Sequence, residues 1–131
     1  MNKLDKIKQI FEAYSLVADE DIFKLTLGGK TTPIITKTGI QKIASKEKYK
    51  YTFEVIVCTP DYCAVRCTVS DSNGEELAQS FGSAEAKNVR NPTKYYLEMA
   101  EKRAKVRAVL IALDVHGYIY SEEEADDFKQ V

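Results

Sequence analysis

The feature that most constrains the fold is a change of hydrophobic period near residue 94. Between residues 49 and 83 apolar and polar residues alternate, which is typical of half-buried strands. Turn sequences at residues 59–61 and 71–74 divide this stretch into three strands. From residue 94 to about 115 the period becomes 3.6, and three alanines spaced by four share one helix stripe. The pattern predicts a three-stranded antiparallel sheet covered by one long helix.

The alternation also predicts which side chains of the sheet enter the core. The first strand is expected to bury one face, made of Tyr49, Tyr51, Phe53, Val55 and Val57. In the third strand Leu77 and Phe81 are expected to point inward. The alanine stripe is expected to let the long helix lie close to the sheet.

The N-terminal third predicts a helix and a hairpin. Apolar residues at helical spacing indicate a helix over residues 3–16, and residues 22–27 favour a strand. A turn at Gly28-Gly29 leads to a short return segment at 33–36, after which Thr36 is suited to cap a small helix. The predicted fold class is therefore α+β: a β-β-β-α core with an N-terminal helix and hairpin.

Charge is distributed unevenly although the net charge of the 131 residues is −1. The last eleven residues contain five of the 20 acids and one of the 19 Lys and Arg, which leaves residues 1–120 with 15 acids and 18 bases. We therefore predict a mildly basic domain at 1–120 and an acidic tail at 121–131, which includes a short helix starting at Ser121. A basic body suits a polyanion partner, but many unrelated domains share this balance.

Two segments resemble the phage single-strand annealing proteins of the Erf-like and Sak-like kind. One is GKTTPIITKTGIQKIA at 29–44, and the other is EMAEKRAKVRAVLIAL at 98–113, with Arg-Ala pairs at Arg103-Ala104 and Arg107-Ala108. The eukaryotic strand-annealing mediator of recombination is a distant relative of this family in fold. The resemblance, over roughly 22–120, implies a β-β-β-α core, ATP-independent binding and annealing of single-stranded DNA, and oligomers that are often rings.

Binding of single strands requires cations for phosphates and flat groups on which bases stack. On the strands the candidate cations are Lys48, Lys50 and Arg66, predicted on the face opposite the tyrosine row. The alternative for the lysines is a solvated sheet face or a charged edge that prevents strand pairing.

Further candidates surround the long helix. Lys87, Arg90 and Lys94 bracket the preceding loop, and a plain surface loop is the alternative. Arg103 and Arg107 flank the alanine stripe and are expected to border a groove between helix and sheet, unless they only pair with nearby acids. Tyr96, or its neighbour Tyr95, is the candidate for stacking a base, or else it covers the helix–sheet edge.

Residue types that support catalysis are sparse. His116 is the single histidine and is expected to satisfy carbonyls at the end of the helix. Cys63 and Cys67 lie roughly 13 Å apart on one strand, too far for one zinc ion, so buried thiols are predicted. The acidic run at 122–127 is expected to be a solvated tail. We predict no enzyme, no cofactor and no metal site.

The leading hypothesis is an ATP-independent protein that binds and anneals single-stranded DNA in phage-type recombination, acting as a homo-oligomer in the bacterial cytoplasm. No membrane segment is expected, because no apolar run approaches the ~18 residues that a membrane helix needs. The acidic tail is a possible contact for a host recombination or replication protein. Two alternatives remain: a phage or mobile-element protein-interaction module without DNA binding, and a coating protein that does not anneal.

Overall fold

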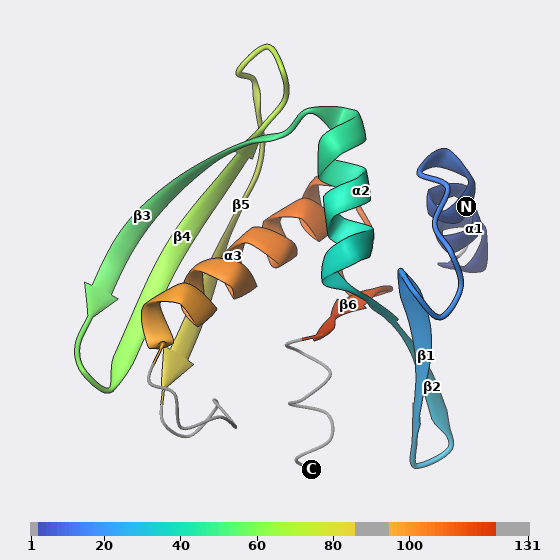
Figure 1. The fold of residues 1–131 in the computed structure, drawn as a ribbon, viewed down its shortest axis with the longest axis horizontal. Coiled ribbons are helices and arrows are strands. Elements are labelled where there is room, and N and C mark those ends of the chain that lie inside the picture. The colour runs from blue at the N-terminus through green and yellow to red at the C-terminus, as the bar shows by residue number, and fades with distance from the viewer. Residues whose placement is uncertain (1–2, 86–94, 123–131) are drawn as a thin grey trace. The chain divides into compact units, whose positions relative to one another are not determined.

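A computed structural model describes residues 3–85 and 95–122 (Figure 1). The chain forms two compact units, one made of residues 1–48 and 113–131 and the other of residues 49–112. We call them unit 1 and unit 2 and describe each by itself.

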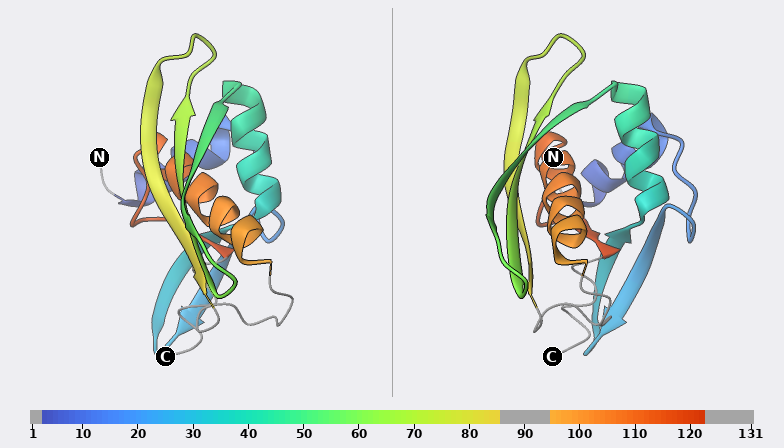
Figure 2. Two further views of the ribbon diagram at one scale, coloured as in Figure 1. Left: turned by 90° about the vertical axis from the view of Figure 1, so that its left-hand side faces the viewer. Right: turned by 60° about the vertical axis from the view of Figure 1, so that its left-hand side comes forward.

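Unit 2 is a three-stranded antiparallel sheet with one long helix. Its strands are β3 (Lys50–Cys58), β4 (Tyr62–Ser70) and β5 (Glu76–Glu85), in the order β3-β4-β5, and its helix is α3 (Tyr96–Ala112). The views in Figure 2 show α3 lying along one face of this sheet. We call that face inner and the opposite face outer. The predicted α+β class and the β-β-β-α core are confirmed.

The helix packs closely on β5 because small residues meet small residues. Every second residue of β5 is small and buried, and these residues are Ala78, Ser80, Gly82 and Ala84. They face the alanine stripe of α3, in which Ala100, Ala104 and Ala108 are fully buried. A Cβ atom at Gly82 would lie 2.3 Å from both the Ala100 oxygen and the Ala104 nitrogen. The backbones of helix and strand are therefore in direct contact.

This contact corrects the prediction for the third strand. Phe81 and Leu77, expected to point inward, are 54% and 42% exposed. The alternation of β5 places its small residues under α3, so Phe81 lies on the outer face opposite Arg66. A bulge at the start of β5 interrupts the register beside Leu77. Size, and not hydrophobicity, decided which side of β5 faces the helix.

The prediction that β3 buries one face is also wrong for most of the strand. Phe53, Val55 and Val57 are 37%, 52% and 39% exposed. The helix packs mainly on β4 and β5, whereas β3 is an edge strand. Tyr51 is the exception, since it is half-buried and the Lys105 ammonium lies 4.6 Å from its ring centroid.

Unit 1 contains the predicted helix and hairpin. Helix α1 (Lys3–Ala13) precedes β1 (Ile22–Leu27) and β2 (Lys30–Ile35), and β6 (Tyr120–Ser121) pairs in parallel with β2. Gly28 and Gly29 form the two-residue hairpin turn with φ of 56° and 79°, which glycine adopts without strain.

The second helix of unit 1 also begins where the sequence predicts. Helix α2 (Lys37–Glu47) starts after Thr36, whose hydroxyl accepts a hydrogen bond from the Gly39 nitrogen at 3.2 Å. It ends at Lys48, a left-handed residue with φ of 55° whose N–H donates to the Ala44 oxygen.

A buried ion pair joins the loop after α1 to α2. The Asp21 side chain is fully buried, and its Oδ2 accepts from the Val17 nitrogen at 2.8 Å and from Lys42 Nζ at 2.6 Å. Burial by itself raises the pKa of Asp21, but the bonds from Lys42 and Val17 outweigh it and hold that pKa below 3.8. Asp21 is therefore ionised in the folded protein at neutral pH.

Candidate nucleic-acid interface

Arg103 and Arg107 lie at the helix–sheet edge that the sequence predicts. Arg103 Nη1 donates to the Ser83 oxygen at 2.7 Å, and Arg107 Nη1 donates to the Phe81 oxygen at 2.8 Å. Both carbonyls belong to β5, which is an edge strand of the sheet. The two arginines therefore attach α3 to β5 and place positive charge along that edge. A guanidinium group has five N–H donors, so the bond from Arg107 to the Phe81 oxygen uses only part of that number.

Strand register builds a row of three side chains across the outer face of unit 2. Glu54 on β3 lies opposite Arg66 on β4, and Arg66 lies opposite Phe81 on β5. Arg66 and Glu54 form an ion pair. The row, which we call the outer-face row, continues to the edge of β5, because Arg107 bonds the carbonyl of Phe81 itself.

Phe81 is the residue of this surface that the sequence argument missed. It is the most exposed of the phenylalanines on the sheet, at 54%. Arg66 lies opposite it on β4, and Arg107 donates to its backbone carbonyl. The signal for its orientation was present in the sequence: positions 78, 80, 82 and 84 hold only Ala, Ser and Gly. Small residues on one face of a strand can pack closely against an alanine stripe on a helix. The larger residues between them then point to the opposite face of the sheet.

This arrangement has the chemistry that single-stranded nucleic acid requires. An exposed aromatic ring offers a surface to any base, and flanking guanidinium groups bind phosphates. Glu54 disfavours the binding of a phosphate, because its carboxylate pairs with Arg66 when no ligand is bound. The strength of the contact between Arg66 and a phosphate therefore depends on how well that phosphate competes with Glu54 for the guanidinium group.

The candidate lysines of the strands belong to different elements. Lys50 is exposed at the start of β3, opposite Ser70. Lys48 does not lie on the strand, since it ends α2 in unit 1. The prediction that Lys48 and Lys50 share a strand face is wrong, because α2 continues to Glu47, Lys48 caps it, and β3 begins only at Lys50.

The remaining candidates surround the start of α3. Tyr96 is the first helical residue and is half-buried, whereas Tyr95 is 61% exposed. Lys87, Arg90 and Lys94 lie outside the described residues, as does the tail beyond Glu122. Helix α3 ends at Ala112, and His116 follows it in an exposed turn segment, where it forms a bridge with Ile119.

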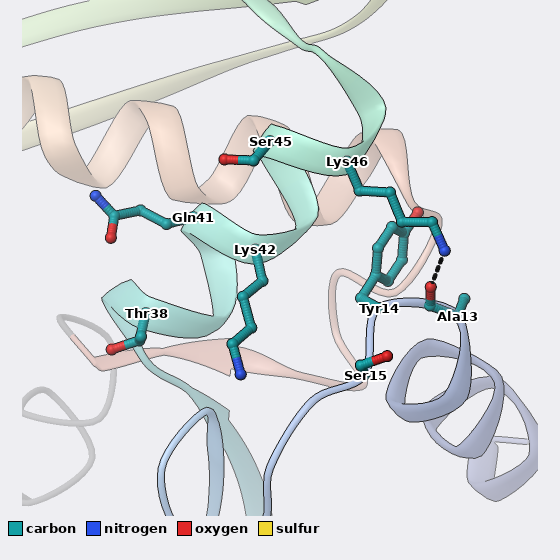
Figure 3. Close-up of a pocket in the computed structure, with 8 residues that line it drawn as sticks. All are labelled: Ala13, Tyr14, Ser15, Thr38, Gln41, Lys42, Ser45 and Lys46. Atoms are coloured by element: carbon teal, nitrogen blue, oxygen red, sulfur yellow. Dashed lines mark hydrogen bonds between the residues drawn. The ribbon is translucent and has the colours of Figure 1, made fainter.

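A second polar site lies within unit 1 (Figure 3). It is a groove of about 710 Å³, lined by α2 and by the end of α1, and its residues are Ala13, Tyr14, Ser15, Thr38, Gln41, Lys42, Ser45 and Lys46. Lys46 donates to the Ala13 oxygen and lies 5.5 Å from the Tyr14 ring centroid. Lys42 is bound to Asp21. Both ammonium groups of the groove thus have internal partners, which makes it a weaker anion site than the outer-face row.

Two of the three thiols are core residues, as predicted. Cys63 and Cys67 are 2% and 0% exposed, and burial raises the pKa of each to about 11. Within residues 3–85 and 95–122 no three His, Cys, Asp or Glu side chains lie together as a metal site.

In the part of the chain that the structure describes, no helix is both long and apolar enough to cross a membrane. No protein-family model, no curated protein and no solved structure matches the chain.

Proposed function

We propose that this protein binds single-stranded DNA and anneals complementary strands without ATP, and that the outer-face row with Arg107 is its contact surface. The observation that supports this best is Phe81, whose exposed ring lies opposite Arg66 and whose backbone carbonyl accepts a hydrogen bond from Arg107.

Stacking on Phe81 suits annealing for a physical reason. A base that stacks uses its flat face, so its Watson–Crick edge stays available to a second strand. Base–aromatic stacking contributes about 1–3 kcal/mol per base and tolerates any sequence. A bound strand can therefore sample partners while the arginines hold its phosphates.

Function as a homo-oligomer is part of the proposal. One copy offers few cations, and repeated copies would extend the contact along a strand. The exposed apolar side chains of β3, an edge strand, support self-association, because such residues favour burial against another chain. In this proposal the protein works in the bacterial cytoplasm of a phage host, and its acidic tail contacts a host recombination or replication protein.

A matched pair of substitutions tests the contact surface. We expect Arg66→Gln to weaken binding of a labelled ~30-mer and to reduce the salt slope of log Kd by about 0.7, the value for one phosphate contact to a single strand. We expect Glu54→Gln to strengthen binding, because Arg66 then has no internal carboxylate partner. Fluorescence anisotropy over a salt series, with single-stranded and duplex oligonucleotides, measures both.

Unchanged or stronger binding by Arg66→Gln, or weaker binding by Glu54→Gln, would contradict the contact surface. If the folded protein does not bind oligonucleotide even at low salt, DNA binding itself is wrong. An ATP-free time course with two complementary strands then separates annealing from mere coating, since only annealing accelerates duplex formation.

The second candidate function is a protein-interaction module. The exposure of Phe53, Val55 and Val57 on one edge strand favours it, because apolar edges of this kind bind other proteins. It is the better account if oligonucleotides do not bind.

A further inference from the structure

Two thiols meet at the closed end of the β3–β4 hairpin. Cys58, the last residue of β3, lies directly opposite Cys63 of β4. Their Sγ atoms are 2.7 Å apart, closer than two sulfur atoms that merely pack against each other. This is a pair, and neither cysteine has any part in the proposed DNA contact.

The turn between them holds the two strands at the spacing that a disulfide needs. The Thr59 nitrogen donates to the Tyr62 oxygen at 2.7 Å, and the Thr59 hydroxyl accepts from the Tyr62 nitrogen at 3.0 Å. Because hydrogen-bonded and non-hydrogen-bonded pairs alternate, the next pair, Cys58 and Cys63, is non-hydrogen-bonded, with Cα atoms about 4.5 Å apart. Disulfides accept Cα separations of about 4.4–6.8 Å.

The two thiols differ in access to solvent. Cys58 is exposed, whereas Cys63 is 2% exposed. An external reagent therefore reaches Cys58 first, and Cys63 is in position to react next. Cys67 is not a competitor, since it is buried four residues further along β4, roughly 13 Å from Cys63 by strand rise.

We propose that Cys58 and Cys63 form a reversible thiol–disulfide site that exchanges with low-molecular-weight disulfides such as oxidised glutathione. The Cys58 thiolate attacks one sulfur of the reagent, forms a mixed disulfide and releases one thiol. The Cys63 sulfur then attacks Cys58 Sγ, forms the Cys58–Cys63 bond and releases the second thiol. The protein loses two protons and two electrons, and the reagent gains them.

The cross-link would fix the end of β3 next to its irregular part. The register of β3 shifts between Val55 and Val57, and Cys58 follows at once. Oxidation therefore joins the bulged, exposed end of the edge strand to the central strand β4. Because burial raises the pKa of Cys63 to about 11, the second step is expected to accelerate as pH rises towards that value.

Whole-protein mass spectrometry after treatment with oxidised glutathione tests the site. We expect a product about 2 Da lighter than the reduced chain, which dithiothreitol reverses, and a peptide map that joins Cys58 to Cys63. Cys67→Ser is the control and should give the same product. Cys63→Ala should stop at a lasting glutathione adduct on Cys58, and Cys58→Ser should give neither product.

Three results would overturn the proposal: a wild-type protein that keeps glutathione adducts without the internal bond, a bond that includes Cys67, or cross-links only between chains. The Cys63→Ala variant is checked for native circular dichroism beforehand. If this variant is unfolded, two rates are measured in the wild type across pH 7–9: formation of the glutathione adduct and formation of the Cys58–Cys63 bond. The adduct has to form before the internal bond if Cys58 reacts first.

Discussion

At position 82 the strand has no space for a methyl group. The atoms that a Cβ would meet at 2.3 Å are backbone atoms of α3, which cannot rotate away as a side chain can. The φ of Gly82 is not in the left-handed region, so the requirement for glycine here is one of packing alone.

We therefore expect Gly82→Ala to lower the free energy of unfolding by about 2–3 kcal/mol, because α3 has to move off β5. Ser83→Ala, one residue further and outside the small-residue row, is expected to change it by less than about 0.5 kcal/mol. Urea unfolding followed by circular dichroism measures both. Equal stabilities of the two variants would contradict the direct contact between backbones.

The Tyr51 hydroxyl is the second residue-scale feature. Its oxygen is buried and has no hydrogen-bond partner among the described residues. Burial, together with the nearby Cys67 and Tyr49 groups, raises the pKa of Tyr51 to about 12. A raised pKa of an acid means that folding favours the neutral form.

This shift predicts a loss of stability in alkali. The contribution of Tyr51 is fully present below pH 10, the ordinary pKa of tyrosine, and it decreases as pH rises towards 12. Tyr51→Phe cannot ionise, so we expect its urea midpoint to fall less than that of the wild type between pH 9 and 11. Buried Cys63 and Cys67 contribute a similar decrease in both proteins. If the urea midpoints of wild type and Tyr51→Phe decrease in parallel as pH rises, the raised pKa of Tyr51 is contradicted.

Among the elements, the link between the loop after α1 and helix α2 depends on one ion pair. Asp21 is fully buried and Lys42 supplies the only ammonium group bound to it in the described residues. Because the folded-state pKa of Asp21 lies below 3.8, the stability from this pair is present above about pH 4 and is lost as pH falls through that lower value.

Removal of the lysine should reverse the sign of the shift. In Lys42→Met, Asp21 stays buried but loses the ammonium group that lowers its pKa. We therefore expect the pKa of Asp21 to rise and acid unfolding to begin at a higher pH. Lys46→Met, one turn further along α2 and bound to a backbone carbonyl, is the matched control. Circular dichroism against pH decides the prediction, and identical acid midpoints would refute it.

The contact of α3 with β5 gives the two arginines a structural role. Arg103→Ala/Arg107→Ala removes two charged hydrogen bonds to β5 carbonyls, and we expect a loss of about 2–4 kcal/mol in the free energy of unfolding. Lys102→Ala on the exposed side of the helix is the control, with a small expected effect. A stability equal to the wild type would show that these bonds contribute nothing. The double variant therefore reports on how strongly α3 is held against β5.

The limits of prediction from sequence are also clearest at the scale of elements. The turns at Gly28-Gly29 and 59–61, the cap at Thr36 and the alternation of the strands depend on local chemistry, so they were predicted within a few residues. The exposure of β3 and of Phe81 was not, because it depends on which strands α3 covers. The helix covers β4 and β5 because the small residues of β5 fit against its alanine stripe. The hydrophobic period of a sequence contains no information on side-chain size, so it does not predict this packing.

For the whole molecule, the boundary between the two units falls between two of the predicted DNA-binding lysines. Lys48 belongs to unit 1 and Lys50 to unit 2, so a single basic face across both is not a property of the sheet. The outer-face row, in contrast, lies entirely within unit 2. The proposed DNA contact therefore depends on one unit, whose geometry is set by β3, β4, β5 and α3.

The charge of the whole chain limits how the protein could bind DNA. A net charge of −1 provides little long-range attraction, so binding has to come from local contacts and from repeated copies. The proposal consequently predicts modest affinity per protomer and a large contribution from stacking.

The most direct measurement of that contribution is the affinity of Phe81→Ala for a single-stranded ~30-mer, compared with Leu77→Ala. Both residues are exposed on β5, at 54% and 42%, but only Phe81 lies in the outer-face row. We predict that Phe81→Ala weakens binding roughly 5- to 150-fold, as expected for the loss of one stacked base, and that Leu77→Ala changes it less than about twofold. Wild-type affinity in folded Phe81→Ala would contradict the account.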